Sequence, residues 1–176
     1  DARPCEAVVD AVTAALRRGD TGYAWAPPFI DAFAEFAEGR WGWRVDTDGA
    51  TLVPDMMIGI EELLYALTSP GDAVVISPPV YDSFFGFISA AGRRIVTAPL
   101  DATGRLDPLS LESSFRSVGP GAVYLLCNPQ NPGGTIFTRA ELARLAAFAQ
   151  KHDLVICSDE IHADIVVSSV DPRLTF

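Results

Sequence analysis

Two polar loops contain most of the residues that could carry chemistry in this sequence. The first loop runs from Asn128 to Gly134 and holds two asparagines, two prolines and two glycines. Proline and glycine fix an irregular backbone, and the amides of Asn128 and Asn131 could then donate hydrogen bonds to a ligand oxygen. An ordinary turn between a strand and a helix would explain this loop equally well.

The second loop runs from Ser158 to His162 and contains Asp159. Asp159 closes the strand that the apolar run 154–157 predicts, a place where a carboxylate is unfavourable unless a partner compensates its charge. A cationic ring nitrogen would be such a partner. A helix N-cap or a local salt bridge would be a more ordinary role for the same side chain.

The elements that must position these loops alternate regularly along the chain. Thr138 and Glu141 have the spacing of a capping box at the start of the last helix, and Gly39 is expected to end the second one. Strands are predicted at 51–53, 73–77, 94–98, 122–127 and 154–158, and helices at 5–18, 29–38, 56–68, 81–91, 108–117 and 138–152. This alternation predicts a three-layer α/β/α fold, with a mostly parallel sheet and helices on both of its faces.

In a fold of this class, sites form at the carboxyl ends of strands. We therefore expect Asn128, Asn131, Asp159 and Tyr81 to converge at one edge of the sheet, although they lie far apart in the sequence.

The composition argues against several function classes. The 176 residues carry a formal net charge of -10 with 13 Lys and Arg, whereas nucleic-acid binding depends on clustered basic residues. The three cysteines match neither a disulfide framework nor a zinc site. No stretch approaches the roughly 20 apolar residues of a membrane span. We expect a cytoplasmic protein with no metal, no nucleic-acid partner and no membrane association.

Taken together, the two loops resemble those of fold type I PLP-dependent enzymes, the aspartate aminotransferase superfamily of class I and II. Their residues are most similar to the MalY/PatB subgroup, which contains cystathionine beta-lyases and relatives assigned as aminotransferases. Further motifs occur in the family's order and near its spacing: Gly22-Tyr23, Pro54-Asp55-Met56-Met57 and Pro78-Pro79-Val80-Tyr81-Asp82-Ser83-Phe84. The resemblance covers nearly the whole chain. It implies a PLP-binding large domain, pyridoxal 5'-phosphate as the cofactor, an amino acid as the substrate and a homodimer.

The resemblance also implies roles for individual residues around the cofactor ring. Asp159 would pair with the protonated pyridine nitrogen, and Asn131 would donate a hydrogen bond to the phenolic oxygen. Tyr81 would stack on the ring, although an ordinary core aromatic is the alternative. His162 stands where related enzymes often carry a tyrosine near that oxygen, and a purely structural histidine is its alternative.

The remaining implied contacts are to the cofactor phosphate. The helix that begins near Met56 would offer free N–H groups of Met56 and Met57, because helix N-termini bind anions. The family often has smaller residues here, so a backbone contact is expected. Tyr23 would reach the phosphate of the neighbouring subunit, which makes it a dimer-dependent residue.

One catalytic group of the family has no counterpart in this sequence. The family forms a Schiff base with a lysine located after the strand that Asp159 ends, whereas Lys151, the only lysine here, precedes that strand. Lys151 is expected to be a solvated charge at a helix end. We expect residues 1–45 to form an N-terminal helical segment with a dimer-contact loop and residues 46–176 to form part of the large domain. The catalytic-lysine segment and the C-terminal small domain would be absent, so this fragment alone would be inactive.

The expected function of the full-length protein is that of a PLP-dependent aminotransferase or a carbon–sulfur beta-lyase acting on amino acids. The segments that would separate the two reactions are not in this sequence. A PLP-binding sensor domain of a transcriptional regulator is the alternative. The acidic charge and the lack of a helix-turn-helix argue against it.

Overall fold

The structure, a computed structural model, describes residues 2–165 of the chain. Helices and strands alternate in the order that the sequence predicts, apart from one strand that does not form. In chain order the elements are α1 (Glu6–Arg17), α2 (Pro27–Trp41), α3 (Met56–Leu67), β1 (Ala73–Ile76), α4 (Ser83–Ala90), β2 (Arg94–Thr97), α5 (Pro108–Ser117), β3 (Val123–Cys127), α6 (Arg139–His152) and β4 (Val155–Asp159).

The four strands are parallel and lie in the order β2-β1-β3-β4. The chain moves from β1 to β2 on one side and then returns to place β3 on the other side of β1, so the strand order reverses between β1 and β3. A reversal of this kind leaves a crevice at the carboxyl ends of the two strands, where ligands bind in open α/β sheets. Cys127 lies opposite Asp159 in the register of β3 and β4, so these carboxyl ends are also adjacent.

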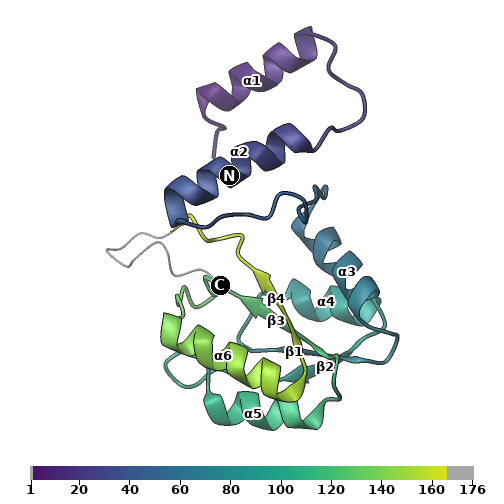
Figure 1. The fold of residues 1–176 in the computed structure, drawn as a ribbon, viewed down its shortest axis with the longest axis vertical. Helices are drawn as coiled ribbons and strands as arrows, with labels where there is room; N and C mark the ends of the chain where they lie inside the picture. Colours follow the sequence, from purple (N-terminus) through teal and green to yellow (C-terminus); the bar gives the residue numbers. More distant parts are fainter. Residues whose placement is uncertain (1, 166–176) are drawn as a thin grey trace.

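Helices cover both faces of the sheet (Figure 1). Successive residues of a strand point to opposite faces, and the apolar clusters follow this rule. Val74 and Leu125 pack in one cluster with residues of α3 and α4, whereas Val75 and Tyr124 pack in another with residues of α5 and α6. The predicted three-layer α/β/α fold is confirmed.

Helix α2 is longer than the sequence predicts and continues through Gly39 to Trp41. The Trp41 ring makes edge-to-face contacts with Phe33 and Phe36, at centroid distances of 6.2 and 5.3 Å. Such aromatic pairs stabilise by about 0.5–1.5 kcal/mol each, which offsets the cost of about 1 kcal/mol for a glycine inside a helix. The helix ends at Gly42, whose φ of 68° is left-handed.

The strand predicted at 51–53 does not form, and this segment leads instead into α3. The side chain of Val53 lies over Gly59 in the first turns of the helix, where an added Cβ would come within 3.0 Å of Val53 Cγ2. Helix α4 starts at Ser83, two residues later than predicted, so Tyr81 belongs to the loop that follows β1.

Helix α1 stands apart from the sheet layers and has no buried residue (Figure 1). Its exposed apolar side chains are those of Val8, Val9, Val12 and Leu16. Among the described residues, no helix has both the length and the apolar composition that crossing a membrane requires.

Candidate functional site

Three loops meet where β1, β3 and β4 end, as the sequence predicts. The backbone N–H of Asn128, just after β3, donates to the carbonyl oxygen of Asp159 at a distance of 3.0 Å. The side chain of Gln130 donates to the carbonyl oxygen of Pro79, in the loop after β1. Asn128, Asn131, Asp159 and Tyr81 follow parallel neighbouring strands, so their loops lie at one sheet edge, while the convergence of their side chains on one ligand stays a prediction.

Asp159 is the most informative side chain at this edge. It is 6% exposed, and its Oδ1 accepts one hydrogen bond, from the Ile161 backbone N–H at 3.1 Å. Burial raises the pKa of its carboxyl above the usual value, while the Ile161 hydrogen bond and the neighbouring His162 act in the opposite direction. The Ile161 bond shows that Asp159 does stabilise the following turn. Among residues 2–165, however, no cationic side chain hydrogen-bonds to the buried Asp159 carboxylate. A cationic ligand would supply such a partner.

The two asparagines of the first loop have different surroundings. Asn128 is fully buried, and its Oδ1 accepts from the backbone N–H of Phe137 at 3.3 Å, so it closes the loop on itself. Asn131 is half-buried, and its side chain has no hydrogen-bond partner within residues 2–165. Of the two amides, that of Asn131 is therefore the better placed to reach a ligand.

Tyr81 lies at the crevice between β1 and β3. Its half-buried ring contacts Phe84 edge to face, with centroids 5.8 Å apart and an interplanar angle of 81°. The contact fixes the ring from one side while the loop leaves part of it exposed. Tyr81 therefore belongs to the apolar layer under α4 and also borders the candidate site.

The start of α3 differs from expectation. Met57 and Ile58 do not offer free N–H groups, because both donate to Oδ1 of the N-cap residue Asp55, at 2.7 and 3.4 Å. A phosphate at this helix end would also face the Asp55 carboxylate. The prediction of a free donor at Met57 is wrong, because the Asp55 side chain caps the start of α3. Met56 borders a separate cavity described below.

His162 and Tyr23 lie in connections rather than in regular elements. His162 is half-buried in the turn after β4, close enough to Asp159 to act on its pKa. Tyr23 lies between α1 and α2 and is fully exposed, so it packs against no other candidate residue within one chain.

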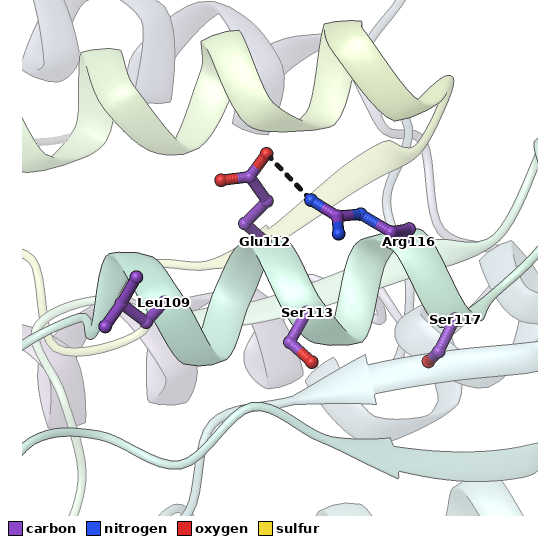
Figure 2. A pocket seen from close by; sticks show the side chains of 5 residues that line it. All are labelled: Leu109, Glu112, Ser113, Arg116 and Ser117. Carbon is purple, nitrogen blue, oxygen red and sulfur yellow. Dashed lines mark hydrogen bonds and ion pairs between the residues drawn. The ribbon is translucent and has the colours of Figure 1, made fainter.

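Lys151 lies away from these loops, as predicted. It occupies the end of α6 that leads into β4, at the opposite edge of the sheet from Asp159, and forms an ion pair with Glu112 of α5. Glu112 also pairs with Arg116, at 3.4 Å, on the side of α5 that faces α6 (Figure 2). These two residues help line a hollow of about 420 Å³ that includes no residue of the three loops.

A second cavity, of about 400 Å³, flanks the Asp159 turn and was not foreseen from the sequence. Aromatic residues from the end of α2 and the following segment form one wall, and residues on both sides of Asp159 form the other. Its lining includes Phe33, Trp41, Trp43, Met56, Ser158, Glu160 and Ile161. An ion pair between Arg40 and Asp164, at 2.6 Å, holds the two walls together.

Several contacts between residues far apart in the sequence anchor the loop after β3. Arg105 donates to Glu141 at 2.7 Å and to the carbonyl oxygen of Ile136 at 3.1 Å. The capping box of Thr138 and Glu141 is confirmed. Ser77, just after β1, and Tyr124, the second residue of β3, share a buried hydrogen bond of 2.8 Å. Only the capping box had a sequence signal, because the other contacts join residues far apart in the chain.

Metal binding has no support in the described part of the chain, where no group of three His, Cys, Asp or Glu side chains could hold an ion. The donor set of the three loops is a carboxylate, an amide and an aromatic ring. This set suits a planar, nitrogen-containing organic group better than a metal ion.

Comparison with known proteins gives a consistent result. The chain matches the family model described as aminotransferase class I and II over residues 4–175. A Mycobacterium leprae (strain TN) protein provisionally named cystathionine beta-lyase is 45% identical over 168 residues, which are 92% of this chain and 42% of that protein. Cystathionine beta-lyase PatB of Bacillus subtilis (strain 168) is 32% identical over 171 residues, 95% of this chain and 44% of PatB.

A solved structure extends the likeness to the fold. The crystal structure of a provisionally assigned, PLP-bound aminotransferase of Clostridium difficile 630 superposes with a TM-score of 0.88 at 27% identity, covering 96% of this chain and 44% of that one. The chain thus spans less than half the length of these relatives. Nothing in these comparisons supports the alternative of a sensor domain.

Proposed function

The chain belongs to the aminotransferase class I and II family, and from that premise we propose that the edge formed by β1, β3 and β4 binds PLP in an enzyme that acts on amino acids. The observation that carries this proposal is the buried Asp159 carboxylate. Desolvation raises its pKa, so an ionised Asp159 gains most from a cation placed beside it. The protonated pyridine nitrogen of PLP is a cation of that kind.

The other residues of the edge suit the rest of the cofactor. Asn131 can donate to a phenolic oxygen, because its amide has no partner within residues 2–165. Tyr81 is half-buried, and the part of its ring that Phe84 leaves uncovered can stack on a flat heterocycle. Asn128 holds the loop that carries Asn131, and His162 modulates Asp159 from the following turn.

When bound, PLP supplies an electron sink for carbanion chemistry at the α-carbon of an amino acid. The residues of this chain would then hold the cofactor ring and polarise it. Asp159 would hold the ring nitrogen in its protonated form, Asn131 would donate to the phenolic oxygen, and Tyr81 would stack on the ring. Met56 stays a proposed phosphate contact, whereas the N–H of Met57 would reach the phosphate only if the Asp55 side chain turns away from α3.

A homodimer and a cytoplasmic location are also part of the proposal, and two features support the homodimer. Tyr23 is fully exposed and contacts nothing within one chain, which leaves it available to a second copy. Helix α1 carries an exposed apolar stripe that a partner subunit would cover.

For the reaction we favour carbon–sulfur beta-elimination over transamination, because relatives at 45% and 40% identity carry the name cystathionine beta-lyase, whereas a relative named as an aminotransferase is 32% identical. In the test, the full-length protein with PLP is supplied with L-cystathionine, and no 2-oxo acid is added as an amino-group acceptor. The thiol, pyruvate and ammonia that form are measured. Equal amounts of the three products support the lyase. Turnover that occurs only with a 2-oxo acid acceptor would assign the aminotransferase reaction. No turnover of cystathionine or other amino acids would contradict the proposal.

A further inference from the structure

Gln130 is a buried, hydrogen-bonded side chain of the loop after β3. It is 4% exposed, and both ends of its amide are used by the protein. Nε2 donates to the carbonyl oxygens of Pro79 and, at 3.0 Å, of Asn131, while Oε1 accepts from the backbone N–H of Gly133 at 2.6 Å. A buried amide with three hydrogen bonds holds its surroundings in one arrangement, because losing any partner leaves a desolvated polar group.

The three partners of Gln130 belong to the two loops that carry the proposed ring contacts. Pro79 lies two residues before Tyr81 in the loop after β1, and Asn131 follows Gln130 directly in the loop after β3. The Gln130 amide thus crosses the crevice between β1 and β3, where the strand order reverses. It joins the backbone that positions Tyr81 to the backbone that positions Asn131.

Gly133 shows that the loop is built around this amide. A Cβ at Gly133 would lie 2.7 Å from Gln130 Oε1, closer than such contacts allow. Gly133 does not have a positive φ, so the demand for glycine at this position comes from close approach to Gln130. Any larger residue would displace the amide from Pro79 and Asn131.

We propose that Gln130 is a positioning residue, which sets the separation between the Tyr81 ring and the Asn131 amide and thereby the orientation of the bound cofactor ring. This inference rests on the proposed PLP site. It assigns Gln130 no contact with the cofactor or substrate, since its amide is already satisfied by Pro79, Asn131 and Gly133.

The test replaces Gln130 by an isosteric side chain that cannot donate. In Gln130→Glu, carboxylate oxygens face the carbonyl oxygens of Pro79 and Asn131, so the two loops should move apart. We expect the affinity of the full-length Gln130→Glu protein for PLP to be about tenfold lower than that of the wild type, as the loss of a buried hydrogen bond implies. The visible circular dichroism of the PLP that still binds should change sign or amplitude. The matched control is Gln150→Glu, on the exposed side of α6, which should bind PLP as the wild type does.

The visible circular dichroism separates positioning from mere stabilisation, because it depends on how the ring is held. If wild-type protein binds PLP and Gln130→Glu shows wild-type affinity and dichroism, the positioning role is overturned while the proposed function stands. If wild-type full-length protein fails to bind PLP, the proposed function falls and this inference falls with it.

A second variant covers the case in which Gln130→Glu does not fold. Gly133→Ala pushes on the same amide from the other side and should alter the dichroism of bound PLP in the same direction. Gly86→Ala, at a helical glycine where a Cβ meets nothing within 4 Å, is the control. Unchanged dichroism in folded Gly133→Ala would overturn the inference.

Discussion

The Asp159 side chain combines a structural cost with a chemical use. Its burial at the end of β4 raises the pKa of the carboxyl, so the ionised form reduces the stability of the fold at neutral pH. A cation bound beside it would remove that cost. A stability cost at one residue that a ligand can relieve is typical of residues placed for function.

We predict that Asp159→Asn separates stability from activity. The uncharged amide relieves the burial cost, so the free energy of unfolding without PLP should stay the same or rise slightly. The rate of the amino-acid reaction in the full-length protein should fall on the order of 10³-fold, as for the loss of other preorganised electrostatic groups. Urea unfolding and steady-state kinetics measure the two effects. Asp164→Asn, at an exposed ion pair, is the control, and near-normal turnover in Asp159→Asn would remove the residue from the site.

At the residue scale, the sequence indicates which side chains reach the edge but not what each of them contacts. The apolar run before Asp159 predicts a buried carboxylate, and the burial is observed. The role of Gln130 has no such signal, because its partner Pro79 lies 51 positions away. Asp55 shows the opposite error. It lies directly before the helix at a spacing typical of an N-cap, so the sequence itself indicates that it caps Met57.

At the scale of elements, the N-termini of helices decide where an anion can bind. In α3 the Asp55 carboxylate already accepts from two of the first-turn donors, those of Met57 and Ile58, and a phosphate would compete with it for the same positive end of the helix dipole. The cap therefore stabilises the free helix and opposes the phosphate contact that the family resemblance implies.

We predict that Asp55→Ser strengthens the binding of PLP to the full-length protein by roughly threefold, because serine still caps the helix but carries no charge. Fluorescence titration with PLP measures the change. Asp107→Ser is a matched control, since Asp107 caps α5 by accepting from Leu109 at 3.0 Å, and it should leave PLP affinity unchanged. Weaker or unchanged binding in Asp55→Ser would place the phosphate away from α3.

A second prediction concerns the start of α6, where Glu141 should make the stability of the fold depend on pH. Burial alone would raise the pKa of Glu141, but hydrogen bonds from Arg105 and Thr138 outweigh it and lower the pKa to about 2. A carboxyl with a lowered pKa stabilises the fold above its ordinary pKa of 4.5, and the stabilisation disappears as the pH falls toward 2.

Wild-type protein should therefore lose on the order of 2 kcal/mol from this group between these pH values. Glu141→Gln should start with a lower free energy of unfolding at neutral pH and lack that part of the acid dependence. Urea unfolding at a series of pH values compares the two proteins. Glu62→Gln, on the exposed side of α3, controls for the loss of one negative charge. Parallel pH curves for wild type and Glu141→Gln would show that the ion pair does not stabilise the loop.

The ends of helices and strands could be predicted where local sequence signals determine them. The predictions failed where contacts between distant segments determine the ends. The capping box places the start of α6 correctly at Thr138. Gly39 wrongly predicted the end of α2, since aromatic contacts of Trp41 extend the helix to Gly42. The segment 51–53 reads as a strand from its composition, but Val53 packs on Gly59 and pairs with no strand of the described sheet.

On the scale of the whole molecule, the two edges of the sheet are chemically distinct. The carboxyl edge gathers Asp159, Asn131 and Tyr81, whereas Lys151 lies at the opposite edge in an ion pair with Glu112. The one lysine of the sequence and the site therefore lie at opposite ends of the strands.

We predict that the purified 176-residue chain binds PLP weakly and reversibly and forms no covalent adduct at the site. Absorbance spectra before and after borohydride, followed by mass spectrometry, measure any permanent attachment. Full-length protein treated in the same way is the positive control. A stoichiometric adduct on Lys151 would show that this lysine reaches the cofactor and that the site is misplaced.

The central claim is that Asp159 holds the pyridine nitrogen of PLP, and ¹⁵N NMR of the full-length protein loaded with ring-labelled PLP tests it most directly. The nitrogen chemical shift should show a protonated ring in the wild type at mildly alkaline pH, because an ionised Asp159 beside the ring raises the pKa of that nitrogen. In Asp159→Asn the shift should move to that of the unprotonated ring. An unprotonated nitrogen in the wild type, or the same shift in both proteins, would contradict the account.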